Sequence, residues 1–148
     1  MKTFKIILLT IITTALIFAS CEKDKNEELQ IVEFSYNCKA SSSVQPETIH
    51  LKAINSDQLE ITHSNVIFAC CPNGELKIEF SLSDATIILN EFYTDISCNC
   101  LCPYDLKFII VNLDYKEYHI QMQRSGEQYF VFDIDYNSNT DTTITINN

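Results

Sequence analysis

The sequence predicts an all-β protein, an antiparallel β-sandwich of about eight to ten short strands, with a small barrel as the alternative. From residue 29 onward apolar residues alternate with polar ones in short runs, which is the period of strands that have one wet face. Polar turns separate these runs at the close spacing that is typical of a sandwich. The period of 3.6 residues that marks an amphipathic helix is nearly absent from the same stretch.

Four apolar runs lie in the first half of this stretch. The clearest is 76–82, in which apolar residues alternate without error against charged and hydroxyl residues. The third run changes register, because its apolar residues are odd-numbered up to Ile61 and even-numbered from Val66. In order, the apolar residues are Val32, Phe34 and Tyr36; Ile49, Leu51 and Ala53; Leu59, Ile61, Val66 and Phe68; and Leu76, Ile78, Phe80 and Leu82.

Three short polar segments are expected to reverse the chain. The only two glycines lie in Asn73-Gly74 and Ser125-Gly126. A tight reversal at these points needs a positive backbone angle φ, which glycine adopts without steric cost. Ser83-Asp84 offers a third hairpin.

Three further runs lie in the second half, and Thr142–Ile146 is expected as a last edge strand. The stretch 106–120, in which Leu113 is followed five residues later by Tyr118, resembles the penultimate strand, corner and final strand of immunoglobulin-like and fibronectin-like modules. There a leucine plugs the end of the sandwich and a tyrosine packs into the corner, so the resemblance implies an immunoglobulin-like fold. The apolar residues of the runs are Leu106, Phe108 and Ile110; Tyr118, Ile120 and Met122; and Phe130, Phe132, Ile134 and Tyr136.

The first twenty residues differ in composition from the rest and indicate a secretion signal. Two lysines precede an apolar run from Ile6 to Phe18, and two small residues stand before Cys21. The run is shorter than the roughly 20 residues that a membrane-spanning helix needs, so a cleaved signal is favoured over a permanent anchor. The fold is therefore expected to occupy residues 29–148 as one domain.

The segment Phe18-Ala19-Ser20-Cys21 resembles the bacterial lipoprotein box, whose cysteine sulfur takes a diacylglycerol before cleavage. The resemblance implies that residues 1–20 are a lipoprotein signal peptide and that an acylated Cys21 holds the chain on a lipid membrane. We expect residues 21–28 to form a disordered charged tether, because Glu22–Glu28 has no apolar residue to pack. This stretch is also similar to the export signal of Bacteroidetes lipoproteins, with a plain spacer as the alternative. The expected location is the outer membrane, lipid-anchored and periplasmic or surface-exposed.

Charge excludes one class of partner. The 148-residue chain has a formal charge of −10, and removal of two lysines with residues 1–20 leaves eight basic against twenty acidic residues, or −12. With Arg124 as its only arginine, the domain has no basic surface to release counterions from nucleic acid. The acidic domain is expected to stand off anionic lipid surfaces.

Six further cysteines are disulfide candidates in an exported chain. Cysteines two residues apart on a strand point the same way about 7 Å apart, too far to pair readily. The Cys-x-Cys-x-Cys trio is therefore expected to pair with the other three cysteines, with a strained vicinal Cys70–Cys71 bridge as an alternative. Strand parity places all six at one end of the core. The sequence does not choose among the remaining connectivities. The candidates are Cys38, Cys70, Cys71, Cys98, Cys100 and Cys102.

A metal or redox site is the alternative use of these cysteines. Together with His63 they would supply soft ligands for zinc or copper(I). Structural zinc sites favour two to four residues between paired ligands and no Cys-x-x-Cys occurs, so disulfides are favoured and no metal or cofactor is assigned. His63, in phase with Leu59 and Ile61, is expected to be a satisfied semi-buried histidine. His50 and His119 are expected on wetter faces.

The segments 61–72 and 98–106 contain Cys-Cys-Pro and Cys-x-Cys-x-Cys-Pro-Tyr-Asp-Leu. This pair of motifs is similar to that of a family of uncharacterised Bacteroidetes outer-membrane lipoproteins. The resemblance brings no known activity. It implies that the two cysteine motifs belong to one structural unit.

No catalytic motif is found. Two glycines exclude a phosphate-cradling loop, and there is no Gly-x-Ser-x-Gly, His-Glu-x-x-His or calcium loop. Asp133 and Asp135 are expected on a solvated face. A binding role would predict a cluster of exposed aromatic residues, for which Tyr93, Tyr115 and Tyr129 are the candidates, but local packing at an edge or turn is favoured for each of them. We expect a non-enzymatic, membrane-tethered cell-envelope lipoprotein that acts as an accessory or binding module, without a named protein or glycan partner. The alternatives are a cysteine-cluster metal-binding or redox lipoprotein and a fimbrial subunit.

Overall fold

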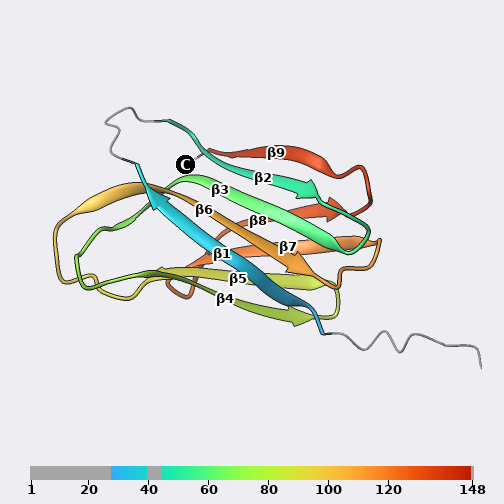
Figure 1. Ribbon diagram of the computed structural model, residues 1–148, viewed down its shortest axis with the longest axis horizontal. Coiled ribbons are helices and arrows are strands. Elements are labelled where there is room, and N and C mark those ends of the chain that lie inside the picture. Colours follow the sequence, from blue (N-terminus) through green and yellow to red (C-terminus); the bar gives the residue numbers. More distant parts are fainter. Residues whose placement is uncertain (1–27, 40–44, 148) are drawn as a thin grey trace, which may run out of the picture.

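The computed structural model describes residues 28–39 and 45–147, and these residues form nine strands and no helix (Figure 1). The strands are β1 Gln30–Cys38, β2 Glu47–Ala53, β3 Gln58–Ala69, β4 Leu76–Ser83, β5 Thr86–Tyr93, β6 Leu101–Val111, β7 Glu117–Arg124, β8 Glu127–Asp135 and β9 Asp141–Ile146. Five make one sheet in the order β1-β6-β3-β2-β9, and four make the other in the order β4-β5-β7-β8. The predicted β-sandwich is confirmed, because two open sheets face each other and no barrel closes.

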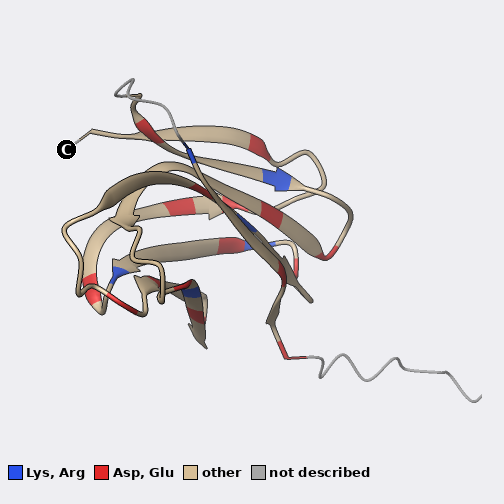
Figure 2. Cartoon of the chain, turned by 60° about the vertical axis from the view of Figure 1, so that its left-hand side comes forward, with Lys and Arg blue, Asp and Glu red and all other residues tan. Residues whose placement is uncertain are grey.

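Most predictions for the N-terminal segment concern residues that the structure does not describe. The signal peptide, Cys21 and residues 22–27 of the tether lie outside the described residues. In the part of the chain that the structure describes, no helix is long and apolar enough to cross a membrane. Acidic and basic residues are spread over the strands of both sheets (Figure 2).

One strand pair departs from the predicted antiparallel arrangement. β5 and β7 run parallel, with Ile87 opposite Ile120. The chain leaves β5 in the four-stranded sheet, runs back along β6 in the five-stranded sheet, and enters the four-stranded sheet again as β7. Two reversals restore the original direction, so the parallel pair follows from the crossing between sheets.

The corner between β6 and β7 carries the expected leucine and tyrosine. Leu113 and Tyr118 are buried, and the backbone N–H of Asp114 donates to the Tyr118 hydroxyl at 3.1 Å. The expected strands β8 and β9 follow Tyr118, so β7 is not the final strand that the resembled modules have at this point. The corner thus joins the two sheets in the middle of the fold.

Apolar residues of alternating strand positions fill the space between the sheets. The main cluster draws on both sheets, and Phe108, Ile110, Ile120 and Leu89 are fully buried in it. A smaller cluster at the disulfide-bonded end consists of Val66, Phe68, Leu76, Cys102, Tyr104 and Leu106.

Two bulges change the strand phase. In β1 the register shifts between Val32 and Ser35, where Glu33 has a φ of 57°. Ile31 and Phe34 therefore pack against the core while Val32 is exposed, so the predicted even-numbered face of this strand is wrong at Val32. In β3 the shift lies between Ser64 and Val66, which accounts for the change of register in the sequence.

The turns are mostly as predicted. Asp84 has a φ of 55° in the β4–β5 hairpin, and Ser125 and Gly126 have φ values of 54° and 87° in the β7–β8 hairpin. The prediction that Gly74 has a positive φ is wrong. The turn before it links the two sheets and does not close a hairpin. Glycine is needed there because a Cβ would collide with the ring of Tyr93.

Candidate functional site

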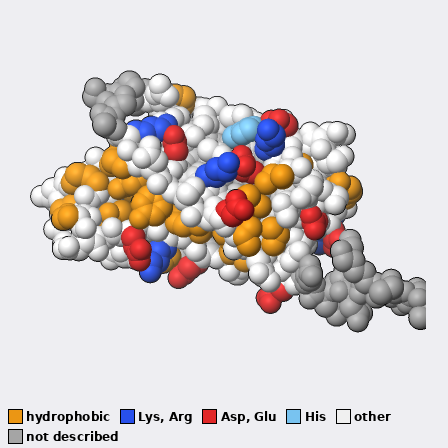
Figure 3. Space-filling view, viewed as in Figure 1, with side chains coloured by type: hydrophobic (Ala, Val, Ile, Leu, Met, Phe, Trp, Pro, Cys, Tyr) orange, Lys and Arg blue, Asp and Glu red, His pale blue; other side chains and the backbone are white. Residues whose placement is uncertain are grey.

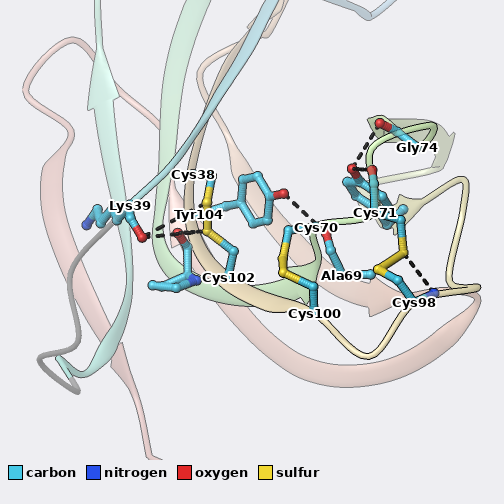
Figure 4. Close-up of a disulfide and its surroundings, with 12 residues drawn as sticks. Cys38, Lys39, Ala69, Cys70, Cys71, Gly74, Cys98, Cys100, Cys102 and Tyr104 are labelled. Carbon is cyan, nitrogen blue, oxygen red and sulfur yellow. Dashed lines mark hydrogen bonds between the residues drawn. A yellow bond between two sulfur atoms is a disulfide. The ribbon is translucent and has the colours of Figure 1, made fainter.

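The six cysteines are paired with one another at one end of the sandwich (Figure 4). The bridges are Cys38–Cys102, Cys70–Cys100 and Cys71–Cys98, with Cα–Cα distances of 6.0, 5.3 and 5.5 Å. These distances lie in the range usual for disulfides. The prediction that the Cys-x-Cys-x-Cys trio pairs with the other three cysteines is confirmed.

Strand adjacency decides which cysteines meet. β6 lies between β1 and β3, and Cys102 in β6 is two residues from Tyr104, the register partner of Cys38. Cys70 follows β3 directly, and its N–H donates to the Cys100 carbonyl at 3.1 Å. One bridge thus joins β1 to β6, and two bridges join the residues directly after β3 to the segment directly before β6.

The segment 94–100 crosses from β5 in one sheet to β6 in the other, and two bridges tie it to the end of β3. The N–H of Cys98 also donates to Sγ of Cys71 at 3.1 Å. At its other end, the N–H of Thr94 donates to the Glu75 carbonyl at 3.0 Å. The crossing segment is therefore fixed at both ends.

Two tyrosines support the bridges from within. The Tyr93 hydroxyl donates to the Cys71 carbonyl at 2.8 Å, and the Tyr104 hydroxyl donates to the Ala69 carbonyl at 3.2 Å. Their ring centroids are 6.3 Å apart. Burial and the neighbouring Tyr93 raise the pKa of Tyr104 to about 12, so its hydroxyl remains a donor at physiological pH.

The three disulfides weigh against the alternative that the cysteines bind a metal. Cysteine binds a metal through its thiolate, which a disulfide-bonded cysteine does not have. Among the described residues, no group of three or more histidine, cysteine, aspartate or glutamate side chains is arranged to hold a metal ion. His63, the histidine considered with the cysteines, contacts Glu47 and Glu91 instead. A metal site here would need reduced cysteines.

His63 lies at the centre of a second, buried group of charged side chains. Its Nδ1–H donates to Oε2 of Glu91 at 2.8 Å, and its Nε2–H donates to Oε1 of Glu47 at 2.9 Å. Arg124 Nη2 donates to the same Glu47 oxygen at 2.7 Å. His63 and Glu91 are fully buried, and Glu47 is nearly so. The four side chains come from β3, β5, β2 and β7, so they link the two sheets.

The geometry of this group favours a charged His63. A neutral imidazole has one donor nitrogen, whereas both nitrogens here face carboxylates. Burial opposes the charge, but Glu91 and Glu47 outweigh it and raise the pKa of His63 to about 9. Burial likewise opposes ionisation of Glu47, yet His63 and Arg124 hold its pKa below the usual range. The charges of two carboxylates and two cations then cancel. We call His63, Glu91, Glu47 and Arg124 the buried quartet.

The ring of Tyr129 contacts two members of the buried quartet. The Tyr129 ring stacks on His63 with 6.4 Å between centroids, and the Arg124 guanidinium lies 4.4 Å from the Tyr129 ring centre. The three candidate tyrosines pack locally, which is the interpretation that the sequence favours, and they do not form an exposed cluster. Tyr129 faces the quartet, Tyr93 supports the disulfides, and Tyr115 contacts Tyr136, so the three candidates do not share a surface.

Sequence reasoning predicted His63 to be a satisfied semi-buried residue, whereas it is fully buried, and it missed the three partners of His63. One signal was present, because Glu91 follows Ile87 and Leu89 in phase on an inward-facing strand. A second was Arg124, the only arginine. Neither signal says which residues meet.

The remaining predicted surface residues lie where expected. His50 contacts Asp141 at 2.8 Å and His119 contacts Asp133 at 2.7 Å, both on exposed surfaces. Asp133 and Asp135 are exposed, as predicted for a solvated face.

The stability of the domain is expected to depend on pH through the buried quartet. The pKa of His63 rises from 6.5 to about 9 on folding, so its contribution is complete below pH 6.5 and is lost as the pH rises toward 9. This loss amounts to about 3 kcal/mol in the free energy of unfolding. Glu47 also stabilises the fold, but its pH dependence runs the other way. Its contribution is complete above its usual pKa of 4.5 and is lost as the pH falls below that value.

Urea unfolding at a series of pH values measures this dependence. We expect the alkaline loss to shrink strongly in a His63→Gln variant and to persist in His119→Gln, a matched change at an exposed histidine. Equal alkaline slopes in the two variants would contradict the assignment.

Comparison with known proteins adds no relative. No protein-family model matches the sequence, and no curated protein and no solved structure matches it.

Proposed function

We propose that the chain is a membrane-tethered, non-enzymatic lipoprotein of the bacterial cell envelope that acts as an accessory or binding module. In this proposal the lipid is carried by Cys21, and the β-sandwich follows a short tether. The outer membrane is the proposed location, in keeping with the resemblance to Bacteroidetes outer-membrane lipoproteins.

The observation that carries the proposal is the pairing of the cysteines. The chain has seven, and six of them form three disulfides. Disulfides form and persist in exported proteins. The seventh is Cys21, which stands directly after Phe18-Ala19-Ser20, at the position that the lipoprotein box reserves for the acylated cysteine.

The placement of His63 weighs against catalysis by this side chain. His63 is fully buried and both its ring nitrogens are engaged by carboxylates. A general base must reach the proton that it abstracts, and a buried, doubly engaged imidazole does not.

Lipidation is tested on the full chain produced in a Gram-negative host. We expect the mature protein to begin at Cys21, to carry acyl chains in its intact mass, and to sediment with membranes. Two acyl chains or more give stable anchoring, whereas one is marginal. The Cys21→Ala variant is expected to incorporate no labelled fatty acid.

A matched soluble form separates anchoring from folding. Residues 22–148 behind a signal peptide without a lipoprotein box are expected to appear in the soluble periplasmic fraction with all six cysteines oxidised. A wild-type chain without acyl mass, or a Cys21→Ala chain that still takes up fatty acid, would refute the proposal.

A further inference from the structure

The strand β4 forms an open edge of the four-stranded sheet. Among the described residues it pairs with β5 alone, and it keeps one continuous register from Leu76 opposite Tyr93 to Ser83 opposite Thr86. Figure 1 shows β4 along the lower border of the molecule. The strand has no proline and no bulge. Its free side can therefore accept another strand along its whole length.

The even-numbered residues of β4 direct their backbone groups away from β5. In a hairpin with a two-residue loop the flanking residues, here Ser83 and Thr86, form a hydrogen-bonded pair, and such pairs recur at every second position. The N–H of Thr94 donates to the Glu75 carbonyl at 3.0 Å, which agrees with this phase at the other end of the pair. The residues whose N–H and C=O groups face the open edge are therefore Leu76, Ile78, Phe80 and Leu82.

Two opposite charges lie on the exposed outer face of this strand, at Lys77 and Glu79. Lys77 Nζ contacts Oε1 of Glu75 at 2.9 Å, and Asn90 Nδ2 donates to Oε2 of Glu79 at 3.2 Å. Both contacts are on the surface, so the two charges remain accessible to a partner. In Figure 3 acidic and basic side chains lie next to one another along the lower border, where Figure 1 has β4.

The other edge strands of the described fold carry acidic residues and no basic one. β1 has Glu33 at its bulge, β9 has Asp141, and β8 has Glu127, Asp133 and Asp135. The mature chain is strongly acidic, so two copies repel each other where such edges approach. On β4 alone among these edges does an approaching copy meet a basic residue.

The spacing of the two charges is self-complementary. In an antiparallel pair of β4 strands with its twofold axis at Ile78, Lys77 of each copy stands opposite Glu79 of the other. These positions lie between the hydrogen-bonded pairs, where facing side chains are closest and opposite charges stabilise. Charged edges obstruct pairing with foreign strands, but a second copy matches the charges by symmetry. We propose that β4 pairs in this register with β4 of a second copy of this chain.

The apolar side chains and the backbone of β4 suit this pairing. Ile78 then faces Ile78 of the other copy and Leu76 faces Phe80, and all three direct their backbone groups at the partner. Ile78 and Phe80 are only partly buried against the main core cluster, so a second strand covers their remaining exposed surface. One strand pair buries less than the about 800 Å² per partner of a stable interface, so the dimer is weak and depends on concentration.

Site-specific photo-crosslinking of the full chain in a Gram-negative host tests this contact. A photoreactive amino acid replaces Ser81, which is exposed on the outer face of β4, and two copies with different tags are produced together. We expect an adduct of twice the monomer mass that carries both tags. The matched control is the same replacement at Thr143, which is exposed on β9 at an edge of the other sheet, where no such adduct is expected.

Charge variants test the register. Lys77→Glu in both copies, or Glu79→Lys in both, sets like charges opposite each other, and each change is expected to lower the yield of the doubly tagged adduct by on the order of tenfold. Glu79→Lys makes the chain less acidic, so an unspecific charge effect would raise the yield instead. With Lys77→Glu in one copy and Glu79→Lys in the other, every facing pair again has one acid and one base. The yield is then expected to return, which also shows that both variants fold.

Several outcomes would overturn the proposal. The dimer is refuted by the absence of an adduct at Ser81, by equal yields at Ser81 and Thr143, or by an adduct with only one tag, which would indicate another protein. The register is refuted if the charge variants leave the yield unchanged or if the mixed pair does not restore it. This readout needs no acyl group, so it is independent of the test of Cys21.

Discussion

Replacing Glu91 with alanine is expected to lower the free energy of unfolding by about 3–5 kcal/mol, the cost of removing one partner from a buried ion pair. Glu91 is fully buried and is the largest charge contribution that raises the pKa of His63. Without it, His63 either stays charged opposite Glu47 alone or loses its proton in a site built for the cation. The variant also leaves a cavity between the sheets.

A Glu91→Gln variant separates charge from packing. Glutamine keeps the shape and an oxygen that accepts from Nδ1 of His63, but it removes the negative charge. We expect a smaller loss of stability than for alanine, together with a lower pKa of His63 and a weaker alkaline decline. Proton-observed titration of the His63 ring in the two proteins measures the shift.

Urea unfolding of the oxidised protein measures the stability change, with Glu127→Ala as the control. Glu127 is exposed in the β7–β8 hairpin, so its replacement is expected to change the free energy by about 0.5 kcal/mol or less. Equal losses for Glu91→Ala and Glu127→Ala would show that the buried quartet contributes nothing to holding the sheets together.

Removing the Cys38–Cys102 bridge is expected to cost about 4 kcal/mol, the largest loss for any single disulfide here. Its cysteines are 64 residues apart, against 30 and 27 for the other two bridges, and a longer loop loses more entropy when it is closed in the unfolded chain. The bridge also joins the edge strand β1 to β6.

The other two bridges are expected to behave as a unit. Cys70–Cys100 and Cys71–Cys98 tie the same two segments, so either one alone closes nearly the same loop. Removing one should cost much less than removing both, and the double loss should approach about 3.5 kcal/mol. Denaturant unfolding of paired Cys→Ala variants gives the three values. A Cys38–Cys102 loss smaller than that of either single bridge would contradict the loop-length explanation.

Intact mass after iodoacetamide treatment is the control for these variants. The chain from residue 22 is expected to take no label before reduction and six labels after it, and each bridge variant four. Labels before reduction, or bound metal, would move the function into the cysteine cluster and favour the metal or redox alternative.

Most strands of the fold follow from the sequence, and the exceptions have local causes. Val32 lies on the face opposite to the predicted one, because the bulge at Glu33 adds a residue to β1. β5 is predicted only by the hairpin at Ser83-Asp84, since Glu91 interrupts the apolar pattern of its inward face. Gly74 has the turn position that glycine favours, yet the ring of Tyr93 is what requires it.

The strand class, the two hairpin turns at Asp84 and Gly126, the inward phase of His63 and the set of cysteines available to pair follow from the sequence alone. Alternation and turn preference act over a few residues, so they can be read along the chain. Only the tertiary structure decided the disulfide connectivity, the parallel β5–β7 pair and the buried quartet. These depend on which strands become neighbours, and the residues that meet are 28 positions apart for His63 and Glu91 and 64 for Cys38 and Cys102. Contacts over such separations are set by the packing of two sheets, which no local pattern encodes.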